Sequence, residues 1–599
     1  MFPLKKLAHA LTSLLVLLSL APLASAQGWT EDSDTDVRGR VIYTWPGTLN
    51  QGYFPFWVEL ENRGDQDRTI HLEATSGGRS GGREVTQSLT LAPGQKQTVE
   101  LFAPAFTILQ GWSNSYRASF RVGNGFAKGM GWVAESQHND GCTFVLFVSD
   151  TKPQPGQIDK WSGQILNGAP GLPWTKHSFS GSLEVEGGHA LFDRLPSQYA
   201  GYTSLDAVVV DAVNGLPSDE SMLPLLEYAR AGGRVVFLGD DVQEELAEFE
   251  QVAGWLEDRF KHENEEHGHS YSYGMGALYF GTTGSELMQT AGQIYLVRRA
   301  LSPPHADLQR DTIPSAAKRN SSRAIMEIPG LDELPLKSFA GMLLIFALII
   351  GPANFWFLKK TKRPALLLLT IPGISIAASV LLLAYGIFQQ GIDVKMVSKT
   401  LTLLDQRARR STTLEERALY IGLSTPPLRP EPGTLVMPVR GEDSIFYYRM
   451  DFRGGLELSG AFNPVRTPVE QVLVSERVRR VRLGVTKDAQ GVEVVNTLPM
   501  GIERLLVRDD EGKWHRHLDG IDPEGRVRLE AIEDSTAETE LNQLHRRYSM
   551  LSDRSLVTSS YIAIVDSGEL RDTCGLELNE MAGSHIVVGI LPLRAEDWE

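Results

Sequence analysis

The chain of 599 residues has a net charge of −16 and no clustered basic stripe, which argues against a protein that binds nucleic acid. Its length leaves room for about three or four domains. The charged fraction of 22% is that of ordinary soluble protein, so we expect most of the mass to lie in water-exposed domains.

Residues 1–26 have the pattern of a secretory signal peptide. Two lysines precede an apolar core from about Ala10 to Leu23, and Ala24-Ser25-Ala26 supplies the small residues of a cleavage site. An uncleaved membrane anchor is the alternative, although the core is short for a membrane span. We expect cleavage after Ala26 and export of the chain that follows.

Residues 27–136 alternate apolar and polar side chains in short runs. In YRASFRV, at 116–122, every second side chain is suited to burial. Turn sequences such as Ala92-Pro93-Gly94 separate the runs. Roughly seven half-buried strands in about 100 residues predict a β-sandwich of the immunoglobulin-like type.

From about residue 140 to 300 the predicted strands become apolar on both faces. TFVLFVSD, LDAVVVD and RVVFLGDD each end in aspartate, and a helix is predicted between the last two, from Ser218 to Gly232-Gly233. Such strands alternating with helices are typical of a parallel sheet covered by helices. The pattern predicts an α/β domain of the Rossmann-like or flavodoxin-like type at 140–300, followed by a linker at 301–337.

Two apolar runs, 338–358 and 365–388, contain no Asp, Glu, Lys, Arg or His over 21 and 24 residues. As helices, both are long enough to cross a hydrocarbon core of about 30 Å. The loop 359–364 has four basic residues, so the positive-inside rule places it in the cytoplasm. Buried helices of a soluble domain, the alternative, would be interrupted by polar residues every few positions. We predict a membrane hairpin with both flanking regions outside the cytoplasm.

Beyond the hairpin, residues 395–599 are again rich in predicted strands. RRVRLGV, GVEVVN, RLLVRDD and GRVRLEA carry the period of two. The order strand, Asn496, turn, strand echoes the order around Asn62 in the first sandwich. We predict a second, sandwich-like, β-rich domain that includes one helix at 536–550.

The progression LDAVVVD, helix, ARAGGRVVFLGDD resembles the glutamine-amidotransferase-like domain of bacterial membrane proteins of unassigned function. The order of exported sandwich, α/β domain and hairpin, with the block Gly351-Pro352-Ala353-Asn354-Phe355, also resembles that group. The resemblance implies a multi-pass protein of the bacterial cytoplasmic membrane whose N- and C-terminal domains are extracytoplasmic. Amidotransferases of the class need a cysteine at a strand-to-helix elbow. Cys142 instead precedes a strand, Cys574 falls in another domain, and we expect no G-x-C-x-G or G-x-S-x-G nucleophile elbow anywhere in the chain.

Four aspartates, Asp150, Asp211, Asp240 and Asp241, follow the strands of the α/β domain. Ligands of open α/β sheets bind beyond the carboxyl ends of the strands. Several carboxylates at that edge would suit Mg²⁺ or Ca²⁺, which prefer oxygen ligands. The structural alternative is that these aspartates cap the helices that follow them.

A second candidate site lies in KHENEEHGHSYSYG, where His262, His267 and His269 stand among glutamates. Imidazole and carboxylate groups suit Zn²⁺ or a similar ion. The spacing matches neither HExxH nor a zinc finger, so a solvated polar loop is the alternative. The sequence assigns no cofactor.

Two further pairs of side chains are predicted to interact. Asn354 and Thr370 lie at similar depth in the hairpin, where a hydrogen bond can join the helices. Cys142 and Cys574 both fall on the predicted outer side and can pair in an oxidising compartment. Two buried free thiols are the alternative for the cysteines.

These features favour a non-catalytic membrane protein that presents binding or scaffold domains at the bacterial cell envelope, with the lipid bilayer and envelope proteins as partners. The alternative is a membrane-anchored hydrolase or amidotransferase relative, with a metal-assisted site in the α/β domain. A transporter is disfavoured because two plain helices cannot build a pathway without oligomerising.

Overall fold

The computed structural model describes residues 28–44, 52–78, 81–105, 116–133, 142–167, 184–265, 268–282, 291–301, 326–331, 336–360, 366–423, 426–438, 447–547 and 556–592. The predicted signal peptide, most of the linker 301–337 and residues 361–365 of the basic loop lie outside these ranges.

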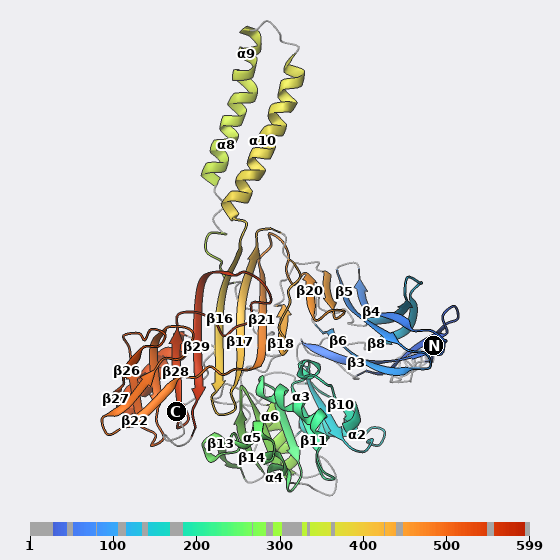
Figure 1. Ribbon diagram of the computed structural model, residues 1–599, viewed down its shortest axis with the longest axis vertical. Helices are drawn as coiled ribbons and strands as arrows, with labels where there is room; N and C mark the ends of the chain where they lie inside the picture. The colour runs from blue at the N-terminus through green and yellow to red at the C-terminus, as the bar shows by residue number, and fades with distance from the viewer. Residues whose placement is uncertain are drawn as a thin grey trace, which may run out of the picture.

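A half-sheet at the centre of the molecule connects its other parts (Figure 1). Strand β16 (Val394–Asp405) pairs antiparallel with β17 (Arg410–Ile421), β17 with β21 (Val469–Val478), and β21 with β18 (Thr434–Pro438). We call these four strands the central half-sheet. On its other side β16 pairs in parallel with β29 (Asn579–Ile590). The half-sheet therefore continues into a nine-stranded sheet of order β18-β21-β17-β16-β29-β28-β24-β25-β27.

Two sheets enclose the core of the N-terminal sandwich. One has the order β1-β2-β3-β6 and the other the order β20-β19-β5-β4-β7-β8. Apolar side chains such as Phe56, Leu72 and Phe120 are buried in this core. The strands of the N-terminal region are β1 (Thr30–Asp32), β2 (Val37–Thr44), β3 (Tyr53–Asn62), β4 (Arg68–Gly78), β5 (Gly81–Leu91), β6 (Lys96–Pro104), β7 (Tyr116–Val122) and β8 (Lys128–Val133).

The N-terminal sandwich is completed by chain that follows the hairpin. Strands β19 (Tyr447–Asp451) and β20 (Glu457–Gly460) form an antiparallel pair, and β19 pairs in parallel with β5. Both strands fall within the predicted β-rich region 395–599, but the sequence does not indicate which sheet they join. The later β-rich region therefore contributes two strands to a sheet of the N-terminal sandwich.

The C-terminal sandwich packs a three-stranded sheet, β22-β23-β26, against the β25-β24-β28-β29 part of the nine-stranded sheet. Val494, Leu505 and Val587 are buried in the core between them. Its elements are β22 (Gly484–Asp488), β23 (Gly491–Val495), β24 (Ile502–Arg508), β25 (Trp514–His517), β26 (Arg526–Arg528), β27 (Glu530–Ile532), α11 (Asp534–Arg547) and β28 (Ser560–Val565). Helix α11 is the helix predicted at 536–550.

The two sandwiches share one strand order. In the first, β2-β3-β6 faces β5-β4-β7-β8; in the second, β22-β23-β26 faces β25-β24-β28-β29. We number the seven strands of each sandwich in chain order and leave out the extra strands β1 and β27. In both sandwiches, one sheet then has the order 1-2-5 and the other the order 4-3-6-7. The likeness predicted around Asn62 and Asn496 thus extends to the topology of both regions.

Asn62, the last residue of β3, has a fully buried side chain. Its Nδ2 donates to the carbonyls of Gln66, Leu91 and Ala92 at 2.8, 3.0 and 3.1 Å. Its Oδ1 accepts the N–H of Gly64 at 3.1 Å. One amide thus closes the turn after the second strand and ties it to the turn between the fourth and fifth strands.

Asn496, directly after β23, repeats this arrangement. Its Nδ2 donates to the carbonyls of Met500, Ile521 and Asp522 at 3.0, 3.0 and 3.2 Å, and its Oδ1 accepts the N–H of Leu498 at 3.1 Å. Around both asparagines, the hydrogen-bond partners are the residues two and four positions later in the chain and two residues in the turn between the fourth and fifth strands. Because buried carbonyls need donors, the amide fixes both turns.

The middle region contains a sheet of order β10-β9-β11-β12-β15-β14-β13. Its first five strands are parallel, and the β13–β14 hairpin adds an antiparallel edge. Alternate residues of β11 enter two different cores, Val208 and Val210 on one face and Val209 on the other. Burial on both faces explains the uninterrupted apolar sequence of this strand.

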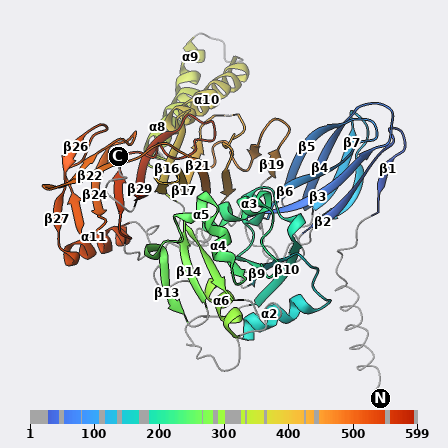
Figure 2. The ribbon, with the colours of Figure 1, turned by 60° about the horizontal axis from the view of Figure 1, so that its bottom comes forward.

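Helices cover both faces of this sheet (Figure 2). Helices α2 and α6 pack on the face that contains Val209, and α3 packs on the opposite face. The elements are β9 (Cys142–Ser149), α2 (Gln157–Asn167), β10 (Glu184–Leu191), η1 (Phe192–Arg194), η2 (Tyr199–Tyr202), β11 (Ala207–Asp211), α3 (Asp219–Arg230), β12 (Arg234–Leu238), α4 (Val242–Ala247), α5 (Glu250–Ala253), η3 (Asp258–Phe260), β13 (Lys261–Glu265), β14 (Gly268–Tyr273), β15 (Gly276–Gly281) and α6 (Ala291–Leu301).

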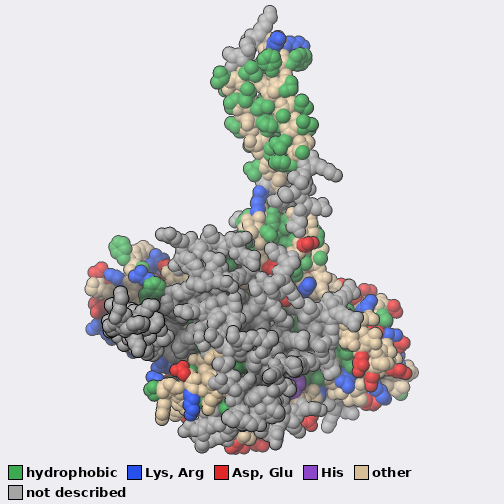
Figure 3. Space-filling view, turned by 180° about the vertical axis from the view of Figure 1, so that it is seen from behind, with side chains coloured by type: hydrophobic (Ala, Val, Ile, Leu, Met, Phe, Trp, Pro, Cys, Tyr) green, Lys and Arg blue, Asp and Glu red, His purple; other side chains and the backbone are tan. Residues whose placement is uncertain are grey.

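Two apolar helical segments project from one end of the central half-sheet (Figure 1). They comprise α8 (Leu336–Leu348), the π-helical turn η5 (Ile349–Ala353) and α9 (Asn354–Lys360) in the first, and α10 (Leu367–Gln390) in the second. Ser338–Lys360 and Leu367–Gly386 are long and apolar enough to cross a membrane. Apolar side chains cover the face of the projecting hairpin seen in Figure 3, and basic side chains lie at its tip. The π-turn contains Pro352, which lacks the N–H that a regular helix would use.

Both ends of the hairpin are fixed to the central half-sheet. Helix α10 ends at Gln390 and β16 begins at Val394. On the other side, Ile328 from the segment before α8 is buried against Ala418 and Tyr420 of β17. Helix α10 therefore continues almost directly into the sheet, and the segment 326–331 before α8 packs on the same sheet.

Replacement of Asn62 or Asn496 by alanine is expected to destabilise the protein, because either change removes the donor to three carbonyls, of which one near Asn62 and two near Asn496 are buried. The expected cost is about 1–3 kcal/mol for each variant. The measurement is the midpoint of thermal unfolding of the detergent-solubilised protein. Asn→Asp at the same positions should cost at least as much, since a carboxylate oxygen would then face the carbonyls.

Asn214→Ala is the matched control, because the side chain of Asn214 makes its hydrogen bond to Asp150 at an exposed site. Its midpoint should stay close to that of the unmodified protein. An Asn62→Ala or Asn496→Ala protein that unfolds with the unmodified midpoint would contradict the structural role assigned to these amides.

Candidate functional site

The carboxyl ends of β9 and β11 bring two of the predicted aspartates, Asp150 and Asp211, to one edge of the parallel sheet. Asn214 donates to Asp150 Oδ2 over 2.9 Å, and Asp211 Oδ1 accepts the N–H of Val213 over 3.4 Å. Burial raises the pKa of Asp211, and the negative charge of Asp150 adds to the rise. Two interacting carboxylates thus occupy the edge at which open α/β sheets bind ligands.

The other two predicted aspartates, Asp240 and Asp241, follow β12 and are exposed. The Asp241 carbonyl accepts the N–H groups of Glu244 and Glu245, so this residue begins α4, although its side chain makes no capping hydrogen bond. Within the described ranges, no group of three or more His, Cys, Asp or Glu side chains could hold a metal ion. The predicted Mg²⁺ or Ca²⁺ site is therefore not formed by the four aspartates.

The predicted histidine site is not assembled either. His262 and His269 lie on adjacent strands, but the register pairs His262 with the residue after His269, so their side chains point to opposite faces. His262 Nε2 lies 2.8 Å from Ser272 Oγ, and His269 Nε2 lies 2.6 Å from Gln243 Oε1. His267 lies outside the described residues. Because side chains alternate between the two faces of the β13–β14 hairpin, two of the three proposed metal ligands lie on opposite faces.

A histidine that the sequence analysis missed lies near the paired aspartates. His189 Nε2, on β10, is 2.8 Å from Ser149 Oγ at the end of β9, and the same hydroxyl donates to the Thr151 carbonyl over 2.6 Å. Since the hydroxyl has one proton, the imidazole acts here as a donor and not as a base. Burial lowers the pKa of His189 to about 4. The pair therefore does not form a nucleophile and general base.

The sequence G-x-S-x-G does occur outside the α/β domain, at 78–82. It joins β4 to β5 in the N-terminal sandwich, whereas a nucleophile elbow joins a strand to a helix. Ser80 itself lies outside the described residues. This motif therefore does not restore the missing nucleophile.

Cys574 is a buried free thiol, so the disulfide predicted with Cys142 is not formed. Its Sγ accepts a hydrogen bond from Arg417 Nη2 at 3.5 Å, and its backbone N–H donates to Asp572 Oδ1 at 2.8 Å. Burial raises the pKa of the thiol to about 11. Cys142 begins β9 in a different sheet, and the alternative of a buried thiol holds for Cys574.

The predicted contact within the hairpin is present. Asn354 Nδ2 donates to Thr370 Oγ1 over 2.9 Å, which joins α9 to α10. The Asn354 side chain is buried, while its apolar neighbours Phe355 and Trp356 are exposed. A polar pair between apolar helices favours one register of the two spans.

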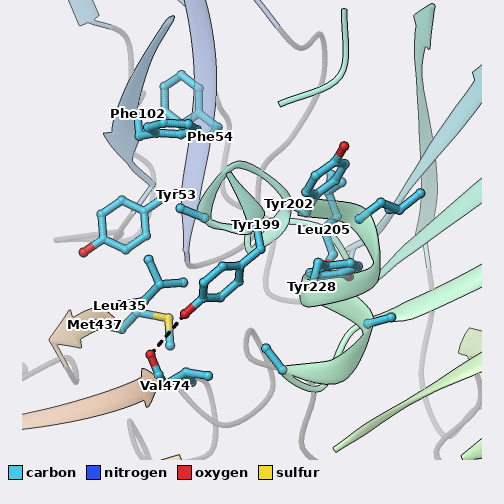
Figure 4. Close-up of a cluster of buried hydrophobic side chains, with 14 of the residues drawn as sticks. Tyr53, Phe54, Phe102, Tyr199, Tyr202, Leu205, Tyr228, Leu435, Met437 and Val474 are labelled. Atoms are coloured by element: carbon cyan, nitrogen blue, oxygen red, sulfur yellow. Dashed lines mark hydrogen bonds between the residues drawn. The ribbon is translucent and has the colours of Figure 1, made fainter. Parts of the chain in front are cut away.

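Tyrosines from two modules meet the central half-sheet at one junction (Figure 4). Tyr53, on β3, donates to the Val436 carbonyl over 2.5 Å. Tyr199, in η2, lies within hydrogen-bonding distance of the carbonyls of Gly433 and Val474, at 2.8 and 3.2 Å. The N-terminal sandwich, the α/β domain and the central half-sheet are thus joined through buried hydroxyl groups.

A cleft of about 780 Å³ opens beside this junction. Its walls come from the N-terminal sandwich at Phe102, from the α/β domain at Gln198 and Glu227, and from the later chain at 429–435 and 450–457. Its volume lies within the range of about 300–1,000 Å³ found for ligand pockets. No single predicted domain would form this cleft, because three separate parts of the chain build it.

The cleft combines apolar walls with charged groups at its rim. Arg429 Nη2 lies 2.7 Å from Glu457 Oε1 on one side. Burial raises the pKa of Glu227 on the other side, and the charge of Glu476 adds to the rise. Its lining also includes Glu431 and the hydroxyl-bearing Ser197 and Thr434. The cleft thus combines an apolar wall with carboxylate, hydroxyl and guanidinium groups that can bind a polar partner.

A buried ion pair fixes the α/β domain to the central half-sheet. Arg230 Nη1, at the end of α3, lies 3.0 Å from Glu476 Oε1 on β21, and the two side chains are 2% and 4% exposed. Thr412 donates to Glu476 over 2.5 Å, and Arg410 lies 3.5 Å away. Burial raises the pKa of Glu476, and the positive charges of Arg230 and Arg410 partly offset this rise.

No protein-family model matches this chain, and no curated protein is similar to it in sequence. Among solved structures, a β-glucosidase from Listeria innocua is 15% identical over 17% of this chain and 16% of its own, with a TM-score of 0.13. A β-glucuronidase from Bacteroides uniformis is 10% identical over 36% of this chain and 35% of its own, with a TM-score of 0.15. These likenesses are too weak to carry an argument about the fold or the function.

Arg230→Ala is expected to destabilise the attachment of the α/β domain, because it leaves the Glu476 carboxylate buried without its main partner. The expected cost is about 3–5 kcal/mol. Limited proteolysis and thermal unfolding of the solubilised protein measure it.

The double variant Arg230→Met with Glu476→Met is the control for this prediction. It removes both charges and is expected to recover most of the stability lost on removing one. Equal destabilisation by the single and double variants would contradict the assignment of an ion pair whose partners depend on one another.

Cys574 is expected to resist alkylation in the folded protein, because its thiol is buried and its raised pKa leaves little thiolate at pH 8. In a Cys142→Ser variant, mass spectrometry should detect no maleimide adduct before unfolding and one adduct afterwards. Rapid labelling of the folded protein would contradict the burial of this thiol.

Proposed function

We propose that this chain is a non-catalytic integral membrane protein of the bacterial cell envelope, which holds binding domains outside the cytoplasm. The observation that carries the proposal is the direct passage from α10 to β16, with Gln390 and Val394 only four positions apart. Around the same half-sheet lie both sandwiches and the α/β domain (Figure 1). A hairpin joined in this way suits an anchor for rigidly arranged recognition surfaces.

The proposed topology places the tip of the hairpin in the cytoplasm. Lys359 and Lys360 lie at that tip, at the opposite end of the hairpin from all the sheets. The positive-inside rule and the signal-peptide pattern of the sequence support the same orientation. Both sandwiches and the α/β domain would then face the periplasm or the outer side of the cytoplasmic membrane.

We further propose that the sandwiches are immunoglobulin-like and that the α/β domain is flavodoxin-like. Numbered from β9, the five parallel strands have the order 2-1-3-4-5, which is the flavodoxin-like order. The resemblance to glutamine-amidotransferase-like domains supports the second assignment. The absence of a nucleophile elbow from the sequence of this domain supports a binding role for it.

The topology predicts the position of reporters fused to the chain. Alkaline phosphatase fused after Glu599 is expected to be active, because it requires export, and a fusion near Lys360 is expected to be inactive. A fluorescent protein that folds only in the cytoplasm should give the reverse pattern. Active phosphatase at the tip with inactive phosphatase at the end of the chain would overturn this orientation.

The binding role predicts that an envelope protein occupies the three-walled cleft. Pull-down from detergent-solubilised membranes is expected to recover a partner with the unmodified chain and much less of it with Arg429→Glu. Arg516→Glu is a matched charge reversal on the C-terminal sandwich and should not reduce recovery. Failure to recover any stable partner would contradict the scaffold function.

A membrane-anchored hydrolase is the second candidate, and the meeting of Asp150 and Asp211 at the sheet edge favours it. Two carboxylates of unequal burial are an arrangement used in acid–base catalysis. The purified protein would then hydrolyse ester, amide or glycoside substrates, and Asp211→Asn would abolish the activity while leaving the fold intact. Equal activity in the variant would exclude this site.

A further inference from the structure

Four apolar side chains outside the helices are exposed at the same end of the central half-sheet. Ile392, Leu423, Val465 and Met581 are exposed by 56%, 46%, 45% and 42%. They come from four separate parts of the sequence, so no single loop accounts for them. Since single exposed apolar residues are common, it is their shared position that calls for an explanation.

The strand registers place all four residues at the hairpin end. Ile392 lies between α10 and the start of β16. Leu423 follows the end of β17, which pairs with the start of β16, and a bridge joins Val465 to the last residue of β17. Met581 is the extra residue of the bulge where β29 runs beside the start of β16.

The apolar surface of the hairpin ends close to this group of residues. The span Leu367–Gly386 is not buried against other parts of the protein, and α10 continues to Gln390. At 1.5 Å per residue, four residues of helix beyond the span cover about 6 Å, and Ile392 follows two residues later. That distance matches the depth of about 5–10 Å over which apolar side chains enter the boundary between headgroups and acyl chains.

We propose that Ile392, Leu423, Val465 and Met581 form a lipid-contacting edge, which rests in the headgroup layer of the membrane that the hairpin spans. The inference rests on the proposed membrane function and adds a second surface to it. Lys395 and Arg466 lie at the same end and can contact lipid phosphates, while Asp393 and the exposed Glu327 supply opposing charges.

The edge would determine the orientation of the whole extracytoplasmic part. With the hairpin alone, the sheets could tilt about the junction between α10 and β16. Contact at the ends of β16, β17 and β21 and at the start of the neighbouring β29 instead fixes the strands upright on the bilayer. The cleft and both sandwiches would then stand at defined heights above the membrane.

Single-cysteine labelling tests the proposal in a Cys142→Ser background, where the buried Cys574 serves as the unlabelled reference. A polarity-sensitive fluorophore is attached at Val465→Cys, at Val478→Cys or at Leu368→Cys, and the protein is reconstituted in vesicles of phosphatidylethanolamine and phosphatidylglycerol. Val478 is the matched control, since it is 71% exposed at the other end of β21. Leu368 lies within the hairpin and is 87% exposed.

The expected result is a blue-shifted emission at positions 368 and 465, with loss of most of the fluorescence to a nitroxide lipid, and neither effect at 478. If the label at position 465 is neither blue-shifted nor quenched, like the label at 478, while the label at 368 is quenched, the lipid-contacting edge is overturned but the membrane hairpin is not. Absence of quenching at 368 would overturn the membrane function itself.

A replacement labelling position and a second quencher complete the test. Leu423→Cys replaces Val465→Cys if that variant fails to fold, as judged by its thermal unfolding midpoint. A label at 465 that is shielded from both the nitroxide lipid and aqueous iodide would show that a second copy of the chain covers the edge, and it would overturn the proposal.

Discussion

Strand β16 is the element on which the other parts of the molecule depend. It pairs with β17 along its whole length and with β29 in parallel from Lys395 to Asp405. Parallel neighbours require a long connection, and here the connection contains the rest of the half-sheet, two strands of the N-terminal sandwich and the C-terminal sandwich. The last strand of the chain must therefore return to the strand that follows the hairpin, so this sheet depends on pairing between residues far apart in the sequence.

The loop between β28 and β29 shows how this non-local pairing shapes the cleft. The Asp572 carboxylate lies 2.7 Å from Arg477 Nη2 and accepts the N–H of Glu431, which lines the cleft. Arg417 donates to the Asp572 carbonyl over 3.3 Å. Glu415 lies on the same strand as Arg417. Burial raises the pKa of Glu415 and so favours the neutral form of its carboxyl group. Because buried charges are costly without their partners, the loop has one favoured position, and it holds the cleft rim in place.

Sequence patterns predicted the elements that depend on local periodicity. The apolar hairpin, the strands with a period of two, the helix after Ser218 and the likeness around Asn62 and Asn496 all follow from short stretches of residues. What they could not predict is which distant strands pair: the alternation of β19 is the same whether it joins β5 or a C-terminal sheet. The cleft and the Ser149–His189 contact depend on such pairings. Residue type alone also does not specify the face of a strand, and for this reason the sequence did not reveal that His262 and His269 point to opposite faces.

The repeated sandwich explains why two similar modules can be attached through different strands. Each has a sheet of order 4-3-6-7, and an exposed edge of such a sheet invites pairing with other chains. In the N-terminal sandwich β19 covers strand 4, β5, whereas in the C-terminal sandwich β16 covers strand 7, β29. Both covering strands come from the chain that follows the hairpin. The chain that follows the hairpin therefore occupies one edge of each sandwich, and this fixes the two modules on either side of the half-sheet from which the hairpin projects.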